Sequence, residues 1–319
     1  MKQTLKKILP ARLWNLLRGS NTVLIRAFRH GLEALGYTVA RRKDYHSPLP
    51  AVSALQKNVH RWYRPSRLPG ITYDLAGMKS TFSNLVSAYY GEFAAHPSYR
   101  EVLTYGFGPG YTALDAFTLY AMLRAYQPRR YLEVGSGVST YYCHLAAQQN
   151  GQEGHPLHIE CIEPHPYKKL YSVVPGSHLH VQEVQDVDLS LFQGLRENDV
   201  LFIDSSHALK IDGDIPFLYL EVLPTLNQGV LIHIHDVPFP YNVPFPAEHW
   251  VFGQNWPMFW NEAMVVQAFL CCNTKFKIIL STPLLRHFEE RFLQQVLPSY
   301  QSVGQEPNTF SSLWLQKVE

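Results

Sequence analysis

The stretch YLEVGSGVST, residues 131–140, decides how the rest of the chain is interpreted. An apolar run ends in the acid Glu133 and is followed by Gly135, Gly137 and a Ser-Thr pair. Glycines in a turn between a strand and a helix let the backbone approach a ligand that a Cβ would exclude. The stretch therefore predicts a strand before the glycines, a helix beginning near Ser139, and a nucleotide site in the turn between them.

Short apolar runs alternate with helical patterns downstream of a T-x-x-D capping box at Thr112–Asp115. Such alternation is typical of a parallel, doubly wound α/β sheet with helices on both faces. Helices are expected over 112–126, 214–223 and 258–272 in this part of the chain, and over 3–18, 22–35 and 74–95 before it. Strands are expected over 130–134, 157–162, 178–184, 200–204, 230–235, 276–280 and 312–317.

The amino-terminal third differs from the rest in composition. Residues 1–70 hold 14 Lys and Arg but only Glu33 and Asp44 as acids, whereas the remainder holds 14 basic and 24 acidic residues. We expect a basic, mostly helical extension with a wrapping linker over 1–104, and a catalytic domain over 105–319. Residues 1–18 are amphipathic and basic, which predicts peripheral contact with an anionic membrane; packing on the protein itself or on a partner subunit is the alternative.

Composition bounds the class of protein. With 46% hydrophobic and 17% charged residues the chain can bury a large core. No apolar run is long enough to span a membrane, and the start of the sequence lacks the pattern of a secretory signal. The four cysteines stand in apolar patterns without C-x-x-C spacing, which predicts buried free thiols. A cytoplasmic protein is expected, with peripheral binding at the inner face of the membrane as a further expectation.

Acids at the predicted strand ends indicate which nucleotide the turn holds. A dinucleotide fold would carry G-x-G-x-x-G, but Thr140 occupies the third glycine position. A carboxylate at Glu133 would repel a pyrophosphate and suits a cationic, amino-bearing ligand such as S-adenosylmethionine. Glu163, at the end of the second strand, can accept both ribose hydroxyls, and Asp186, after the third, is placed to meet the adenine amino group. The residues assigned to the cofactor site are Glu133, Gly135, Ser136, Gly137, Ser139, Glu163, Asp186, Asp204 and Ser205.

These motifs together resemble a class I S-adenosylmethionine-dependent methyltransferase. The likeness extends over about residues 105–319 and includes YLEVGSGVST, HIECIEP at 158–164, LFIDSSH at 201–207 and HIHD at 233–236. It is strongest to a bacterial branch that also carries EVLP, WNE and QAFL, here at 221–224, 260–262 and 267–270. The resemblance implies a Rossmann-like, doubly wound sheet of seven strands with the last strand antiparallel. It implies the cofactor and the reaction type, not the acceptor.

Catalytic residues are expected at the carboxyl ends of the fourth and fifth strands. Asp204, His207 and His235 are the candidates for catalysis there. The ordinary pKa of histidine makes His207 a natural general base; the alternative is that it orients Asp204. His233 and His235 alternate on one face of the fifth strand, and His233 is expected to be a buried, hydrogen-bonded structural residue.

A divalent metal ion at these strand ends is a further expectation. The residue types there are compatible with a metal but do not require one. O-methyltransferases of related fold acting on sugars and catechols hold such an ion with acids there, and Asp204 and Asp236 match those positions. This chain departs from that pattern by carrying His235 and Ser206 where further oxygen ligands usually stand. The predicted metal ligands are Asp204, His235 and Asp236, with an imidazole that suits Mn, Fe or Zn better than Mg²⁺. A metal-free acid–base cluster is the alternative.

The loop at 237–257 is long and rich in proline and aromatic residues, which predicts a lid over a sugar ring or planar acceptor. The expected activity is O-methylation of a hydroxyl on a glycan, glycolipid or small natural product. N-methylation of a small molecule or peptide and a non-catalytic, cofactor-binding scaffold are the alternatives. Nucleic acid is not expected as a partner, because the acidic catalytic domain would repel phosphates. Homo-oligomerisation is left open.

Overall fold

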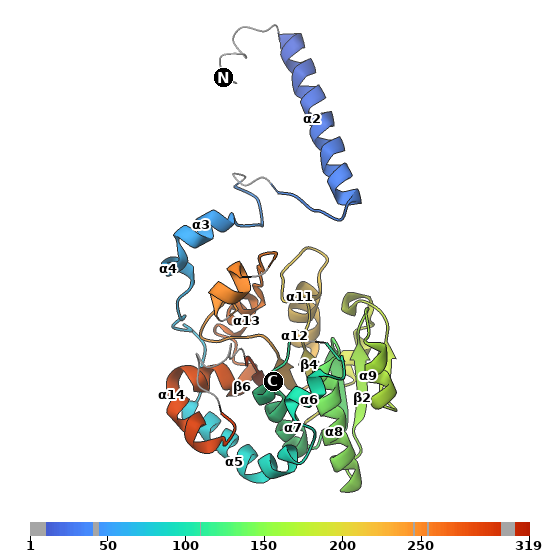
Figure 1. Ribbon diagram of the computed structural model, residues 1–319, viewed down its shortest axis with the longest axis vertical. Coiled ribbons are helices and arrows are strands. Elements are labelled where there is room, and N and C mark those ends of the chain that lie inside the picture. Colours follow the sequence, from blue (N-terminus) through green and yellow to red (C-terminus); the bar gives the residue numbers. More distant parts are fainter. Residues whose placement is uncertain (1–10, 41–44, 109, 245, 254, 301–309) are drawn as a thin grey trace. The chain divides into compact units, whose positions relative to one another are not determined.

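The computed structural model describes residues 11–40, 45–108, 110–244, 246–253, 255–300 and 310–319 (Figure 1). The chain divides into two compact units, Met1–Val59 and His60–Glu319. This division falls well before the predicted boundary at 104, because α5 (Leu75–Ala94) packs within the larger unit against α7 (Ala113–Tyr126) and α14 (Thr282–Val296).

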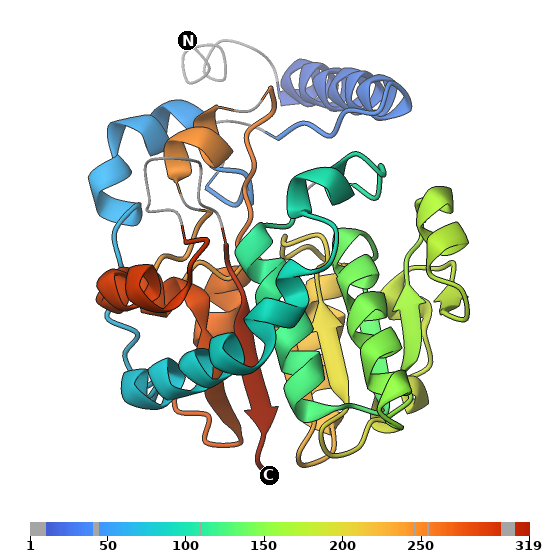
Figure 2. The same ribbon diagram turned by 60° about the horizontal axis from the view of Figure 1, so that its bottom comes forward.

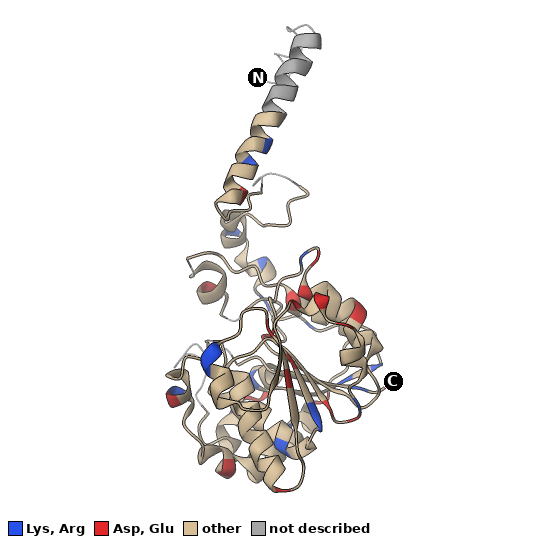
Figure 3. Ribbon diagram, turned by 90° about the vertical axis from the view of Figure 1, so that its right-hand side faces the viewer, with Lys and Arg blue, Asp and Glu red and all other residues tan. Residues whose placement is uncertain are grey.

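The smaller unit is mainly helical. A single helix, α2 (Ala11–Ala34), runs through the two segments for which separate helices were expected, and α3 (Val52–Lys57) follows. The charged side chains of α2 within the described residues are Arg26, Arg29 and Glu33, and Figure 3 shows blue and red positions along this helix. The predicted membrane contact at 1–18 falls on residues 1–10 and on the side chains of 11–18, which lie outside the described part of the chain. Among the described helices, none combines the length and apolarity needed to cross a bilayer.

The larger unit is built on a seven-stranded sheet with the order β3-β2-β1-β4-β5-β7-β6. Six strands run in the same direction, and β7 alone lies antiparallel, between β5 and β6. This confirms the predicted doubly wound, Rossmann-like sheet and its antiparallel last strand. The strands are β1 (Arg130–Val134), β2 (His158–Ile162), β3 (His178–His180), β4 (Val200–Ile203), β5 (Leu231–Ile234), β6 (Phe276–Ser281) and β7 (Leu313–Lys317).

Helices cover both faces of this sheet (Figure 2). On one face α7 packs between α5 and α8 (Val138–Gln152), and on the other a helical segment over 214–225 contacts α13 (Glu262–Leu270). That segment consists of α11 (Asp214–Phe217), a π-helical turn (Leu218–Val222) and α12 (Leu223–Thr225). The short elements are α4 (Val59–Trp62), α6 (Tyr99–Leu103), α9 (Lys168–Val173), a 3₁₀ turn (Val184–Asp186), α10 (Ser190–Gln193) and a π-helical turn (Glu248–Phe252).

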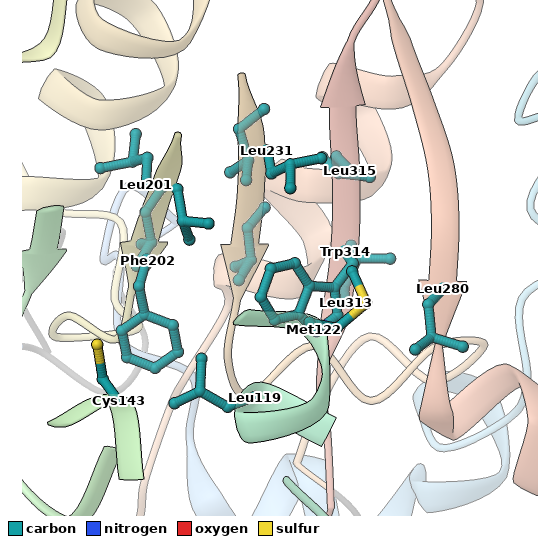
Figure 4. Close-up of a cluster of buried hydrophobic side chains, with 14 of the residues drawn as sticks. Leu119, Met122, Cys143, Leu201, Phe202, Leu231, Leu280, Leu313, Trp314 and Leu315 are labelled. Carbon is teal, nitrogen blue, oxygen red and sulfur yellow. The ribbon is translucent and has the colours of Figure 1, made fainter. Parts of the chain in front are cut away.

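The core lies where α7 and α8 meet the central strands. Figure 4 shows Phe202 of β4 and Trp314 of β7 on the side of the sheet that faces Leu119 and Met122 of α7. Leu119, Met122, Phe202 and Trp314 have at most 1% of their surface exposed. Burying large side chains of this kind stabilises a fold by about 1.5–3 kcal/mol each, so the central strands are held rigidly and fix the positions of the residues at their ends.

Two expectations about individual segments were wrong. The cysteines Cys143 and Cys161 are buried as predicted, but Cys271 and Cys272 are exposed, because α13 ends at Leu270 and the chain turns at the surface. The third strand was expected over 178–184 but pairs only through His178–His180, since β3 is an edge strand with a single neighbour.

Candidate active site

The glycine turn after β1 lies against the end of β4. Gly135 has φ +99°, a backbone conformation that favours glycine. A Cβ at Gly135 would stand 2.4 Å from the carbonyl oxygen of Asp204, closer than any real contact. The turn is fixed from both sides: Gly135 N donates to the carbonyl oxygen of Ile162 at 2.9 Å, and Asp204 N donates to that of Val134 at 3.0 Å. Three neighbouring strand ends therefore meet at this glycine.

Glu133 lies beneath the turn and is fully buried. Its two carboxyl oxygens accept hydrogen bonds from the hydroxyls of Ser139 and Thr140, the latter at 2.8 Å, and Thr140 Oγ1 accepts from Gly137 N at 3.0 Å. Burial raises the pKa of Glu133 to about 8, despite these hydrogen bonds. Glu133 therefore shapes the turn from below, and at neutral pH its carboxyl group is protonated.

Replacing Glu133 by glutamine is expected to remove a pH dependence of stability. The pKa of Glu133 is raised from 4.5 in the unfolded chain to about 8 in the folded one. Between these values the unfolded chain loses a proton that the folded chain keeps, so the free energy of unfolding falls as pH rises. At ~1.4 kcal/mol per pKa unit, the free energy of unfolding falls in total by on the order of several kcal/mol.

Urea unfolding from pH 5 to 9 measures this fall. The free energy of unfolding should decline less steeply with pH for Glu133→Gln than for the wild type. Glu163→Gln, the same change at a partly exposed strand end, is the control; parallel curves for Glu133→Gln and the wild type would contradict the assignment.

Two connected pockets open at the carboxyl ends of β1, β2 and β4. One has a volume of ≈ 640 Å³ and the other ≈ 170 Å³, and Gly135, Glu163 and Asp204 line both. Of the residues predicted to bind a cofactor, those that line at least one pocket are Gly135, Ser136, Gly137, Ser139, Glu163, Asp204 and Ser205. Glu133 and Asp186 line neither. Most residues of the predicted nucleotide site thus line a cavity, and the identity of its ligand remains a prediction.

Asp186 does not reach this cavity. It is exposed at the end of the 3₁₀ turn Val184–Asp186, while Val184 and Gln185 of the same turn line the larger pocket. The short edge strand β3 ends early and the following turn rotates the acid outward. Gln185 was not anticipated, because an amide directly before an acid carries no distinct signal in the sequence.

Asp204, His207 and Asp236 form a compact cluster beside the smaller pocket. His207 Nε2 lies 3.2 Å from Asp204 Oδ1 and 3.4 Å from Asp236 Oδ2. His207 has φ +56° and Asp236 has φ +57°, a left-handed backbone that is uncommon outside glycine and that often marks functional positions. The structure thus brings together the ends of β4 and β5, as expected for a site in a doubly wound sheet.

His235 belongs to the same cluster but is buried beneath it. His235 Nδ1 lies 3.4 Å from Asp204 Oδ1 and 3.6 Å from Asp236 Oδ2, and Nε2 lies 3.4 Å from Asp115 Oδ2. Its neighbour on the strand, His233, is also fully buried and stacks on Trp314 at 4.2 Å between ring centroids. Neither ring nitrogen of His233 makes a hydrogen bond to a described residue, so the hydrogen-bonded role expected for it is not found there.

Glu262 was not anticipated in the sequence, although it closes the quoted WNE motif. Its Oε2 lies 2.7 Å from His207 Nδ1, and its Oε1 accepts from the hydroxyl of Tyr219 at 2.8 Å. The backbone N–H groups of Asn261 and Glu262, at the start of α13, donate to the carbonyl oxygen of His207 at 2.9 and 3.1 Å. His207 is therefore held at both its ring and its backbone, and this contact makes α13 begin at 262 rather than at the expected 258.

Asp115 is a second acid whose contact with a histidine of the cluster was not predicted from the sequence. It was expected to cap α7, and Asp115 N does donate to Thr112 Oγ1 at 3.1 Å. Its carboxylate also accepts hydrogen bonds from Ser311 N at 3.1 Å and Ser312 Oγ at 2.6 Å, besides pairing with His235. These partners lie 120 to 197 residues away in sequence, beyond the reach of a local motif.

Opposing charges set the protonation of the cluster. Burial lowers the pKa of His207, but Asp204, Glu262 and Asp236 outweigh it, so this pKa lies well above its ordinary value. The same balance, with Asp236, Asp204 and Asp115 as the acids, raises the pKa of His235. Burial raises the pKa of Asp204, but His235 and His207 outweigh it and lower it. With its proton in place, His207 donates hydrogen bonds and does not act as a base, so general-base catalysis requires that this proton first be displaced.

The same geometry fits a metal ion. One ligand atom each of Asp204, His207 and Asp236 lies within 4.8 Å of the others. Two carboxylates and an imidazole suit a transition metal. The predicted set contained His235 in place of His207; both imidazoles stand beside the same two carboxylates, so the geometry adds His207 to the candidates. A cation bound there would take the place of the proton on His207.

A further pocket, with a volume of only ≈ 20 Å³, lies beside Asp236 and is lined in part by residues of the aromatic loop. Asp236, Trp250, Trp260 and Arg286 line it, together with Pro238, Pro244 and Ser311. The Trp260 ring is 4.5 Å from that of His207, and Trp250 stacks on Trp260 at 5.8 Å with 25° between the planes. Asp204 thus faces the glycine-turn pockets, and Asp236 faces a pocket with an aromatic wall.

Comparisons with known proteins agree with this picture. Residues 132–237 match the model of a family described as a methyltransferase domain, which confirms the predicted resemblance over that segment. An uncharacterized protein of Archaeoglobus fulgidus is 37% identical over 89 residues, 27% of this chain; the chain spans 39% of that relative's length.

Solved structures with a similar chain path include two O-methyltransferases. TomG from Streptomyces achromogenes, involved in tomaymycin synthesis and solved with S-adenosylmethionine, has 17% identity and a TM-score of 0.42; the likeness covers 78% of this chain and 91% of that one. The O-methyltransferase from Bacillus cereus, solved with S-adenosylhomocysteine, has 13% identity and a TM-score of 0.42 over 76% of this chain and all of that one (100%).

Proposed function

Since residues 132–237 match a methyltransferase domain, we propose that this protein is an S-adenosylmethionine-dependent methyltransferase acting on a hydroxyl group. The observation that carries the proposal is the arrangement of pockets around one cluster. Asp204 lines the glycine-turn pockets, Asp236 lines the aromatic pocket, and both carboxylates lie within 3.4 Å of His207 Nε2. A methyl donor in the first cavity would meet an acceptor at this cluster on the Asp236 side, where the pocket of ≈ 20 Å³ has to widen to admit it.

The glycine-turn pockets suit the donor. The larger one, at ≈ 640 Å³, falls within the size range of cofactor sites, and Glu163 lines both cavities. Glu163 Oε1 accepts a hydrogen bond from His165 N at 2.7 Å, which orients the carboxylate at the strand end. In the proposed complex Glu163 accepts the ribose hydroxyls, and the turn from Gly135 to Ser139 lies against the methionine part of the donor.

The acid–imidazole cluster suits a hydroxyl acceptor better than an amine. A hydroxyl must lose its proton during transfer, and positioned acids, bases or metal ions assist that loss. Asp204, His207 and Asp236 would hold a divalent cation, which supplies Lewis-acid activation of a bound hydroxyl. The acceptor in this proposal is a glycan, glycolipid or small natural product. Contact of residues 1–18 with a membrane and homo-oligomerisation remain predictions.

Replacing Glu163 by alanine is expected to weaken cofactor binding by at least about tenfold. Each charge-assisted hydrogen bond to a ribose hydroxyl contributes roughly 1.5–3 kcal/mol, and about 1.4 kcal/mol is a factor of ten. Calorimetric titration with S-adenosylhomocysteine measures the change. Glu221→Ala, an exposed glutamate in the π-helical turn, is the matched control. Equal affinities for Glu163→Ala and wild type would remove Glu163 from the ribose site.

The function itself is tested by titrating the purified protein with S-adenosylmethionine and S-adenosylhomocysteine, before and after chelation, with elemental analysis of the same sample. Binding of both nucleotides supports the proposal. A stoichiometric metal in the sample would support Asp204, His207 and Asp236 as its ligands. If the nucleotides bound without a metal, the proton of the acceptor hydroxyl would have to pass to the side chains of the cluster. If neither nucleotide bound, the protein would be no methyltransferase of this kind.

A further inference from the structure

Tyr111 carries a buried hydroxyl group at the wall of the smaller glycine-turn pocket. The residue is 5% exposed and is among those that line this cavity of ≈ 170 Å³. Its hydroxyl oxygen is shielded from solvent and makes no hydrogen bond to any residue in the described part of the chain. A hydroxyl offers one donor and two acceptor positions, and burying it unpaired costs stability. An unpaired hydroxyl at the wall of a cavity indicates a contact with the molecule that the cavity binds.

Contacts of its backbone and its ring hold Tyr111 in this place. The hydroxyl of Tyr99 donates to the backbone carbonyl oxygen of Tyr111, and the next residue, Thr112, caps α7. The ring of Tyr111 lies 4.7 Å from that of His235 and 6.3 Å from that of Phe202, measured between ring centroids. Because His235 pairs with the acids of the histidine–carboxylate cluster, Tyr111 belongs both to the wall of the pocket and to the surroundings of the cluster.

The position of Tyr111 corresponds to the reacting end of the proposed donor. In the proposed complex the turn from Gly135 to Ser139 lies against the methionine part of the donor, and this turn and Tyr111 line the same small pocket. The described lining of the larger pocket, where the adenosine part has room, does not include Tyr111. The methyl group has to leave the donor toward Asp204 and the cluster. A residue that lines the small pocket and also packs against His235 therefore lies close to the sulfonium and its methyl group.

A neutral oxygen suits this end of the donor. The sulfonium is positively charged, and the hydrogens of its methyl group share that charge, so they can donate weak C–H···O hydrogen bonds. Burial raises the pKa of Tyr111 well above its ordinary value, and Asp115 and Asp204 add to the effect, so the hydroxyl keeps its proton at neutral pH. Glu133, the acid expected to meet the charge of the donor, is protonated beneath the turn. The hydroxyl oxygen of Tyr111 is thus an acceptor at the small pocket.

We propose that the hydroxyl oxygen of Tyr111 contacts the sulfonium-bound methyl group and so distinguishes the methyl donor from its demethylated product. S-adenosylhomocysteine has neither the positive charge nor the methyl group, so it cannot make this contact. The donor is held with its methyl group at the cluster, and the product binds without the same gain in affinity. This inference rests on the proposed function and adds to it a residue that recognises the methylated state of the cofactor.

Three ligands that differ at this one centre test the assignment with the full chain. They are S-adenosylmethionine, S-adenosylhomocysteine and sinefungin, in which a carbon bearing an ammonium group replaces the methylated sulfur. Calorimetric titration compares the wild type with Tyr111→Phe, which removes only the hydroxyl. Affinity for S-adenosylmethionine should fall about 2–5-fold, the range of a C–H···O contact. Affinity for sinefungin should fall on the order of 10-fold or more, because its ammonium is a full hydrogen-bond donor. Affinity for S-adenosylhomocysteine should match the wild type.

The same change at a second buried hydroxyl supplies the control. Tyr142 of α8 is buried, its hydroxyl likewise makes no hydrogen bond to a described residue, and it is absent from the described lining of both glycine-turn pockets. Tyr142→Phe should bind all three ligands like the wild type. If Tyr111→Phe lost no more affinity for S-adenosylmethionine and sinefungin than for S-adenosylhomocysteine, or if Tyr142→Phe showed the same selective loss, the inference would be overturned. Failure of the wild type to bind any of the three ligands would instead count against the proposed function.

Discussion

Replacing His207 by alanine is expected to lower turnover by on the order of 10²–10⁴-fold, while S-adenosylhomocysteine still binds with wild-type affinity. The range is that of a lost general base, the role that His207 can take once its own proton has been displaced. His207 Nε2 lies between Asp204 and Asp236, where the two sets of pockets meet, and its ring is not part of the glycine-turn pockets. Single-turnover transfer of a labelled methyl group to a substrate of the protein measures the loss.

A second histidine variant separates this effect from a general effect of losing an imidazole. His158→Ala removes a half-exposed ring at the amino end of β2, away from the cluster, and should leave turnover unchanged. Retention of wild-type turnover in His207→Ala would move the catalytic role to His235 or to the carboxylates. Loss of nucleotide binding together with turnover would mean that His207 supports the fold of the pocket instead.

Replacing Glu262 by alanine is expected to destabilise the protein by about 3–5 kcal/mol, the cost of removing one partner from a buried charged pair. Glu262 has 1% of its surface exposed and joins His207 Nδ1 to the hydroxyl of Tyr219. Its loss leaves a buried imidazolium and a buried hydroxyl without this acceptor. Urea unfolding, followed by tryptophan fluorescence, measures the change in the free energy of unfolding.

The conservative variant shows what the carboxylate does for His207. Glu262→Gln keeps one acceptor oxygen at the same place, so it should recover much of the stability, while its neutral charge holds a protonated His207 less firmly. Glu248→Ala, at an exposed acid of the π-helical turn Glu248–Phe252, is the control and should unfold like the wild type. An unchanged unfolding curve for Glu262→Ala would show that the contact with His207 contributes nothing.

Much of the sheet could be predicted because its strands are buried on both faces. Val200–Ile203 is continuously apolar and Leu231–Ile234 is apolar except for His233, and the structure buries every residue in both. Helix α14 was missed, although Ser281 as a cap, a proline in the first turn and an amphipathic pattern were all present in the sequence. Separate helices were predicted over 3–18 and 22–35, but from residue 11 onward the described chain forms one helix, α2, because no described residue of that segment breaks the backbone hydrogen bonds.

The site was predictable where it depends on strand ends and not where it depends on distant packing. Asp204, His207 and Asp236 follow β4 and β5 directly, and the sheet brings them together as expected. Glu262 and Asp115 come from helices, 55 and 120 residues away from the histidines they contact. Nothing in a local pattern distinguishes an acid that caps a helix from one that also pairs with a histidine. The prediction for Glu133 met the same limit. Its carboxyl group was expected to contact the cofactor, but it is buried beneath the glycine turn and supports that turn.

The position of β7 has a consequence for how the nascent chain matures. During translation β5 and β6 are synthesised before β7, yet in the folded sheet β7 lies between them and pairs with both. Ser311 and Ser312, at the entrance to β7, supply the hydrogen bonds that Asp115 accepts across 196 and 197 residues. Contacts closed over such distances form late and slowly. The glycine-turn half of the site, built from β1, β2 and β4, can therefore assemble during translation, while the histidine–carboxylate half must wait until β7 has been synthesised.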